Sequence, residues 1–260
     1  MSSSLKKYFD YLDKISELIN QVSHALQNYI AARTAIRDYV INADEKHYAE
    51  VKERISEALS ALQAAEPIVE EETLDNIRGF LDVIRKWGDI ARDVHDGFAS
   101  YREIIQTKIL PNFSAVTQAG NALLQSAPAS TIGIVNDVQT ANVAVMGYLF
   151  DGDPNVAEAA NQAFRSAKTK IGALKKSDKK LTAALKPFAA GLDAYAAGFL
   201  DAVKSRNKAY KMFREDLAPF GAEIQEDFED FHAWLADMQK GIKDLKVLAD
   251  HGKRGIPQVH

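Results

Sequence analysis

Helical periodicity is the feature that most constrains this chain. Apolar and aromatic side chains recur at alternating steps of four and three residues through nearly the whole sequence, while glycine and proline are sparse. This spacing gathers the apolar side chains on one face of an α-helix, whereas a half-buried strand would need alternation at every second residue. The sequence therefore predicts an all-α fold.

Six helices account for the sequence, at about 5–41, 45–66, 73–126, 131–150, 156–175 and 181–249. Thr73 is the expected N-cap of the third helix, and Ser130 or Thr131 that of the fourth. Pro111 and Pro219 lie inside the two longest helices. Each should kink its helix, because proline lacks the N–H of an intrahelical hydrogen bond.

The lengths of the helices predict the topology. The third and sixth contain about 54 and 69 residues, which is about 80 and 100 Å at ~1.5 Å per residue. Two long helices that run through two stacked four-helix bundles satisfy these lengths with short connections. Residues 1–97 with 207–250 would form one bundle and residues 98–206 the other, followed by a C-terminal tail at 251–260.

A weak internal repeat agrees with two bundles. The stretch RTAIRDYVINAD (33–44) aligns with NVAVMGYLFDGD (142–153), so that Tyr39 matches Tyr148 and Asp44 matches Asp153. In both stretches an amphipathic helix ends and a turn follows. The aligned residue numbers differ by 109 throughout.

Arg33 interrupts the apolar series of the first helix, which reads Tyr29, Arg33, Ile36 and Val40 at steps of four and three. An unpaired guanidinium on a bundle seam is costly, so it needs an acidic partner, water or an anionic ligand. Arg37 follows one turn later on the same side of the helix. Two adjacent guanidinium groups suit a carboxylate ligand, because each can hold it through two parallel hydrogen bonds. The alternative is an ion pair of Arg33 with an acid on a facing helix, for which the candidates are Asp82, Asp89 and Glu215.

Counting residues from the turn places Trp87 and Arg85 of the third helix at the level of Arg33, and Tyr29 lies one turn lower on the seam of the first helix. Tyr29 and Trp87 could form an aromatic wall around a small acid, although aromatic side chains at helical spacing usually belong to the core. Arg85 lies at the same level on the third helix. It also belongs to the series Arg78, Arg85 and Arg92, whose spacing of seven is typical of a solvated helix face.

Two candidates belong to the second bundle. Arg206 falls on the seam of the sixth helix near the junction of the bundles, where it either binds a second ligand or pairs with an acid and fixes the junction. Asn142 stands where the repeat places Arg33, and Met146 where it places Arg37. A pocket at this level would therefore prefer a neutral or weakly polar ligand, and an empty structural module is the alternative.

Composition and motifs exclude several classes of function. A net charge of −4 argues against nucleic acid as the main partner, because phosphate binding needs a concentrated basic face. The chain has no cysteine and no apolar run of the ~18 residues that a membrane span needs. It contains no pair of Glu-x-x-His units, no HExxH, no glycine-rich phosphate loop and no GxSxG. We therefore expect a protein without a metal, a cofactor or enzymatic activity.

The helix end IRDYVINADEKHY and its repeat VMGYLFDGDPNV resemble the four-helix-bundle sensor regions of bacterial chemoreceptors. Two such units with shared long helices are similar to the helical bimodular ligand-binding domain of methyl-accepting chemotaxis proteins. The resemblance implies an extracytoplasmic, periplasmic sensor that forms a homodimer. It also implies that transmembrane helices in the parent inner-membrane receptor anchor it, with residues 98–206 as the membrane-distal bundle. In that family, arginines of the first helix bind small organic acids, and Arg33 and Arg37 occupy comparable positions.

Two other functions stay open at this point. One is the sensor of a histidine kinase that docks a periplasmic binding protein, which an exposed apolar patch where APASTIG meets KKSDKK would favour. The other is a component of a helical pore-forming toxin, whose membrane-inserting segment would be residues 132–150. This segment is interrupted by polar side chains at Asn136, Asp137, Gln139 and Asn142.

Overall fold

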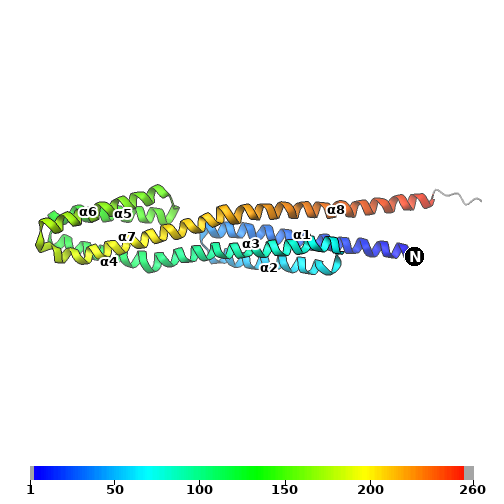
Figure 1. Cartoon of the computed structure of the whole chain (residues 1–260), viewed down its shortest axis with the longest axis horizontal. Helices are drawn as coiled ribbons and strands as arrows, with labels where there is room; N and C mark the ends of the chain where they lie inside the picture. Colours follow the sequence, from blue (N-terminus) through cyan, green and yellow to red (C-terminus); the bar gives the residue numbers. More distant parts are fainter. Residues whose placement is uncertain (1–2, 255–260) are drawn as a thin grey trace, which may run out of the picture. The chain divides into compact units, whose positions relative to one another are not determined.

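The computed structural model describes residues 3–254, and within them every regular element is a helix (Figure 1). The elements are α1 (Ser3–Asn42), α2 (Glu45–Ala65), the 3-10 helix η1 (Glu66–Ile68), α3 (Glu71–Ile104), the π-helix η2 (Ile105–Ile109), α4 (Leu110–Ser126), α5 (Pro128–Asp151), α6 (Pro154–Ser177), the 3-10 helix η3 (Lys179–Leu181), α7 (Thr182–Lys211), the π-helix η4 (Met212–Leu217) and α8 (Ala218–Arg254). The π-helices join α3 to α4 and α7 to α8 without a break, so the described residues form six continuous helices. The predicted all-α class is confirmed.

The chain divides into two compact units. Unit 1 comprises Met1–His95 and Tyr210–His260, and unit 2 comprises Asp96–Ala209. In unit 1, α2 and α8 both pack against α1, and in unit 2, α4 and α6 both pack against α5 (Figure 1). The stacking of two bundles stays a prediction. Of the tail predicted at 251–260, residues 251–254 belong to α8, which ends at Arg254, and residues 255–260 lie outside the described part of the chain.

The two turns that the repeat aligns have the same geometry. Ala43 and Gly152 both adopt the left-handed conformation, with φ of 55° and 75°. Their backbone N–H groups donate to the carbonyl oxygens of Tyr39 and Tyr148, at 2.7 and 2.8 Å. The next residue in each turn is an aspartate N-cap, which accepts the N–H two residues later at 2.9 and 2.8 Å. The repeat is therefore a structural repeat at these turns.

The two prolines predicted to disturb the long helices are each preceded by a π-helix. Pro111 follows η2, and Pro219 follows η4, by two residues. Proline cannot donate to the carbonyl four residues before it and its ring crowds the preceding turn, and the wider π turn accommodates both effects. The predicted disturbance therefore takes the form of a local change in helix type.

Two helix starts differ from the prediction. Thr73 lies inside α3, which begins at Glu71 after a short turn, and its N–H donates to the Glu70 carbonyl oxygen at 3.1 Å. Helix α5 begins at Pro128, before Ser130 and Thr131. Proline at a first helical position is favourable because the N–H it lacks would have no intrahelical partner. Thr131 instead lies buried and donates its hydroxyl to the Ala127 carbonyl oxygen at 2.7 Å.

The buried face of α1 is rotated from the predicted seam. Ala25, Ala32 and Ala35 are at most 3% exposed, whereas Leu26 is only partly buried. Small side chains therefore occupy the centre of this face, where the neighbouring helices approach closely. Arg33 lies at the edge of the face and is partly buried.

Candidate functional site

Arg33 is held by a hydrogen-bonded chain of side chains on α8. Its Nη1 donates to Oε1 of Gln225, and Nε2 of Gln225 donates to Oε1 of Glu229 at 2.7 Å. The glutamine thus links the guanidinium to a carboxylate that does not touch it. Among the described residues, Arg33 has no carboxylate within ion-pair distance.

The three acids proposed as partners of Arg33 pair elsewhere. Asp82 contacts Arg85 at 3.1 Å, Asp89 contacts Arg92 at 2.9 Å and Glu215 contacts Lys211 at 3.7 Å. Each pair lies within one helix and is largely exposed. Arg33 therefore pairs with none of these three acids and donates to an uncharged amide instead.

Tyr29 and Trp87 lie together, as an aromatic wall around a ligand would require, but their polar groups contact the backbone of η4 and α8. Their rings meet edge to face with centroids 5.4 Å apart, and both side chains are fully buried. The Tyr29 hydroxyl donates to the Gly221 carbonyl oxygen at 3.4 Å, and Trp87 Nε1 donates to the Leu217 carbonyl oxygen at 3.3 Å. Burial raises the pKa of Tyr29 well above its usual range, against a smaller lowering effect of the Arg33 charge.

Gly221 allows this close packing. A Cβ at this position would lie 2.7 Å from Trp87 Nε1 and 3.0 Å from Arg33 Nε. The space beside Arg33 is thus filled by an aromatic side chain and by helix backbone. The cavities described below are not lined by Arg33, Arg37, Tyr29 or Trp87.

Arg37 and Arg85 are both exposed, and they have different surroundings. Among the described residues, Arg37 has no hydrogen-bond or ion-pair partner. Arg85 lines a groove between α2 and α3, which contains neither Arg33 nor Arg37. The structure therefore does not assemble Arg33, Arg37 and Arg85 into one site, and an anion held by Arg33 and Arg37 stays a prediction.

The groove between α2 and α3 has a volume of ≈380 Å³. The two helices touch beneath it, where Ile55 Cγ2 lies 3.5 Å from the Cβ position of Gly88. The lining combines aliphatic side chains, three cations and one carboxylate. Its residues are Tyr48, Val51, Lys52, Ile55, Ser56, Leu59, Arg85, Gly88, Asp89 and Arg92.

Positive charge predominates in this groove. Lys52, Arg85 and Arg92 face a single lining acid, Asp89. Lys52 Nζ also lies 5.3 Å from the centre of the Tyr48 ring, which stacks on His95 with centroids 3.8 Å apart. Tyr48, which lines the groove, thus contacts both Lys52 and His95. The arrangement can accept an anion whose carbon skeleton rests on the aliphatic side chains.

Of the three cations that line the groove, the sequence analysis named only Arg85 as a candidate site residue. Arg92 was visible in the series of arginines spaced by seven, which indicated a solvated face and not a site. Lys52 carried no signal, because its relation to Arg85 depends on the packing of α2 against α3. Cations on two different helices come close together only through tertiary packing, which the spacing within one helix does not predict.

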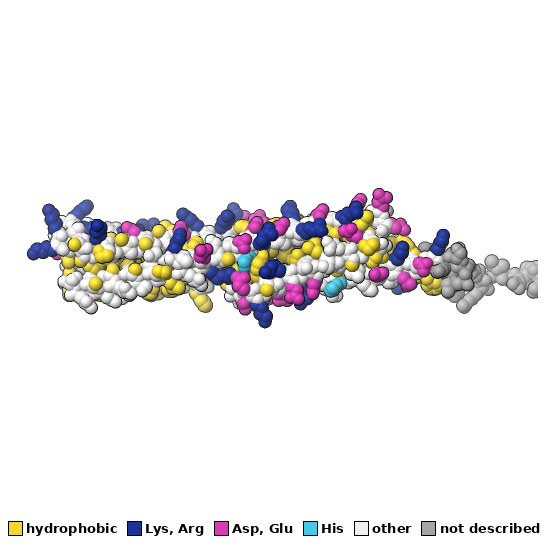
Figure 2. Space-filling model, turned by 90° about the horizontal axis from the view of Figure 1, so that it is seen from below, with side chains coloured by type: hydrophobic (Ala, Val, Ile, Leu, Met, Phe, Trp, Pro, Cys, Tyr) yellow, Lys and Arg dark blue, Asp and Glu magenta, His cyan; other side chains and the backbone are white. Residues whose placement is uncertain are grey.

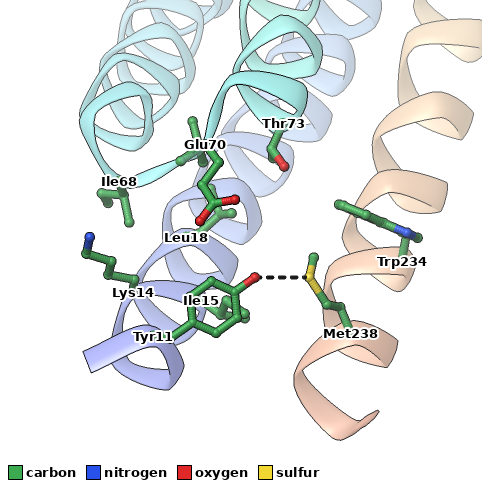
Figure 3. A pocket seen from close by; sticks show the side chains of 10 residues that line it. Tyr11, Lys14, Ile15, Leu18, Ile68, Glu70, Thr73, Trp234 and Met238 are labelled. Carbon is green, nitrogen blue, oxygen red and sulfur yellow. Dashed lines mark hydrogen bonds between the residues drawn. The ribbon is translucent and has the colours of Figure 1, made fainter. Parts of the chain in front are cut away.

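A second cavity in unit 1, of ≈200 Å³, lies between α1, α8 and the connection from η1 to α3 (Figure 3). Lys14 and Glu70 bring one charge of each sign, and the Tyr11 hydroxyl donates to Met238 Sδ at 4.0 Å (Figure 3). Thr73 and Trp234 complete its polar lining. Because the two charges balance, this cavity favours an anion less than the groove does.

Arg206 in unit 2 closes the end of α5. It is 8% exposed, and its Nη1 donates to the Tyr148 carbonyl oxygen at 2.9 Å. The guanidinium also lies over the rings of Tyr148 and Tyr101, at 5.3 and 5.9 Å from their centres. It occupies the space that a side chain at Gly152 would need, since a Cβ there would lie 1.7 Å from Nη1. These contacts give Arg206 a structural role at the end of α5, and its pairing with an acid at the junction of the bundles, like a second ligand, stays a prediction.

Asn142 is partly buried and accepts a hydrogen bond of 2.8 Å from the hydroxyl of Tyr195. Burial raises the pKa of Tyr195 well above its usual range. The amide thus satisfies a phenol in the interior of unit 2. A ligand role for Asn142 stays a prediction.

Residues 3–254 contain no group of three or more histidine, cysteine, aspartate or glutamate side chains that could hold a metal ion. The same residues form no helix that is both long and apolar enough to span a bilayer. No protein-family model matches the sequence, and a search of curated proteins finds no significant match.

Proposed function

We propose that this chain is a helical sensor domain that binds a small organic anion in the groove between α2 and α3. The observation that carries the proposal is the lining of this groove, which combines aliphatic side chains with three cations, Lys52, Arg85 and Arg92, and one acid, Asp89. Arginine holds a carboxylate through two parallel hydrogen bonds, and the aliphatic side chains cover the apolar part of the ligand.

The ion pairs of the groove do not prevent binding. Arg85 and Arg92 pair with Asp82 and Asp89 along one exposed helix face. Pairs of this kind contribute only about 0.3–0.5 kcal/mol in a helix, so a carboxylate held by two cations can compete with them. The volume of ≈380 Å³ lies within the range of small-molecule sites, which is about 300–1,000 Å³.

The sensor part of the proposal rests on the resemblance to chemoreceptor domains. The equal geometry of the turns at Ala43 and Gly152 supports a chain built from two related helical units, as that resemblance implies. Periplasmic location, a membrane-anchored parent receptor and a homodimer belong to the same proposal. In such a sensor the ligand acts by preferring one helix arrangement, and it shifts the equilibrium only by its difference in affinity between the two states.

Thermal unfolding against a panel of small mono- and dicarboxylates tests the proposal. A ligand at 100 times its dissociation constant should add about 2.7 kcal/mol to the free energy of unfolding, which raises the midpoint visibly. We expect the rise to disappear in Arg85→Gln/Arg92→Gln and to persist in Arg33→Ala. If the rise in midpoint disappears only in Arg33→Ala, the anion binds at Arg33 of α1 and not in the groove. If no acid raises the midpoint, the proposal is contradicted.

A further inference from the structure

Helix α5 carries apolar side chains on two faces, and only one of them is used in the fold. The buried face packs in the core of unit 2 with Ile134, Val138 and Val145. The other face is exposed, although it bears several large apolar groups: Val143 is 74% exposed and Phe150 is 92% exposed.

The exposed face follows the spacing of a coiled-coil seam. We call it the α5 seam, and it consists of Ile132, Asn136, Gln139, Val143, Met146 and Phe150, at alternating steps of four and three. Such a stripe on an exposed helix is the pattern that packs against another helix. Asn136, Val143 and Phe150 take the a positions of the heptad, and Ile132, Gln139 and Met146 take the d positions.

The six residues of the α5 seam carry no charge. Asp137 is the one charged residue between 132 and 150. Its carboxylate is 20% exposed and turns to α6, where Lys170 Nζ and Ser166 Oγ contact it at 2.7 and 2.6 Å. On the one face that Figure 2 shows, unit 2 has broad areas without charged side chains and a few lysine and arginine groups, whereas unit 1 displays many acidic and basic groups.

Small side chains flank the seam on one side. Gly133, Thr140 and Gly147 occupy the e positions, which in coiled coils usually carry charged residues. A shallow hollow of ≈690 Å³ lies there, lined by α5 side chains from Asn136 to Gly147 and by Val156 of α6. A partner helix can therefore approach closely beside Thr140 and Gly147, whereas at Gly133 the ammonium of Lys170 donates to the carbonyl oxygen at 3.3 Å.

We propose that a second copy of this chain covers the α5 seam, with the two α5 helices parallel about a two-fold axis. Identical copies bring identical side chains together, and only an uncharged seam escapes like-charge repulsion in that arrangement. Parallel packing also sets Asn136 against Asn136 of the second copy, which is the pairing that fixes register and favours dimers. The seam is about 27 Å long at ~1.5 Å per residue, so we expect a dimer that dissociates on dilution.

Sedimentation equilibrium of the wild-type chain, the variant Val143→Glu and the control Leu200→Glu tests this surface. Leu200 is an exposed leucine of α7 in the same unit and lies outside the seam. We expect wild type and the control to dimerise equally with rising concentration and Val143→Glu to stay monomeric. A circular-dichroism melt checks that the variants fold. Dimerisation of folded Val143→Glu at the wild-type level, or a wild type that is monomeric at every concentration, would overturn the proposal.

Cross-linking tests the direction of the helices, because the chain has no cysteine of its own. In the parallel arrangement, Asn136→Cys and Phe150→Cys should each form a disulfide-linked dimer by itself, since residues at equal positions face each other. Cross-links that form only when the two variants are mixed would overturn the parallel arrangement. If wild type is monomeric and binds lipid vesicles, and Val143→Glu loses this binding, the α5 seam contacts a membrane and not a second copy of the chain.

Discussion

Arg206 donates a hydrogen bond of 2.9 Å to the carbonyl oxygen of Tyr148 and so places a buried cation at the C-terminal end of α5. The carbonyl groups of the last helical turn carry partial negative charge, and a cation beside them is stabilising. The same carbonyl oxygen accepts the N–H of Gly152 at 2.8 Å. The carbonyl oxygen of Tyr148 thus links the end of α5 to the turn, through Gly152, and to α7, through Arg206.

Replacement of Arg206 by alanine should destabilise unit 2. A hydrogen bond from a charged group contributes about 1.5–3 kcal/mol, and the lost contacts with the two tyrosine rings add to it. We expect the free energy of unfolding from urea titration to fall by about 2–3 kcal/mol. Arg206→Lys should recover part of this, because it keeps the charge. A loss below about 0.5 kcal/mol would fit a surface residue and contradict the structural role.

Ala43→Gly and Gly152→Ala should change the free energy of unfolding in opposite directions, because both positions have the left-handed conformation. Ala43→Gly should stabilise unit 1, because the left-handed conformation costs a non-glycine residue about 1–2 kcal/mol. Gly152→Ala should destabilise unit 2 by at least that amount, because the new Cβ also displaces Arg206. Chemical denaturation of both variants checks the signs. Equal signs would show that the turns are not equivalent.

Gly221 and Gly241, both in α8, form a matched pair. Gly221→Ala should destabilise unit 1 by about 1–3 kcal/mol, because the added Cβ overlaps Trp87 and approaches Arg33. Gly241→Ala meets no atom within 4 Å. It should therefore stabilise the helix by about 0.5–1 kcal/mol. Tryptophan fluorescence during urea unfolding measures both changes, and a stabilised Gly221→Ala would contradict the packing beside Trp87.

Stability should fall at alkaline pH because of Tyr29 and Tyr195. Burial raises the pKa of both hydroxyls in the folded state. Their contribution is therefore complete below the unfolded pKa of about 10, and it is lost as the pH rises above that value and the unfolded chain gives up its protons first. Urea titrations at a series of pH values should show a smaller alkaline loss for Tyr29→Phe and Tyr195→Phe, with Tyr11→Phe as the exposed control. An unchanged loss in both buried variants would contradict this origin.

Local features of the sequence predicted the helices and the repeat. Asp44 and Asp153 are N-cap residues after helix ends, and a turn of this kind depends on a few adjacent residues, so an alignment of short stretches was enough to find it. The prolines likewise showed where the long helices change, because the missing N–H is a local property.

The position of Arg33 could not be predicted from the same spacing. Alanine was not counted in the apolar series, yet Ala25, Ala32 and Ala35 form the centre of the buried face of α1. The predicted seam was therefore rotated from the buried face, so that Arg33, which lies at the edge of that face, was expected at its centre. The groove was missed for another reason, since Lys52 and Arg85 come together only through the packing of α2 against α3.

Calorimetric titration of a carboxylate selected by the thermal screen is the most direct test of the central claim. It compares wild type with Arg85→Gln/Arg92→Gln and with the control Arg78→Gln, an exposed arginine of the same helix that does not line the groove. We predict binding to wild type and to the control with equal affinity, and a loss of at least tenfold in the double variant, because tenfold corresponds to about 1.4 kcal/mol. Equal affinity in all three proteins would contradict the anion site between α2 and α3.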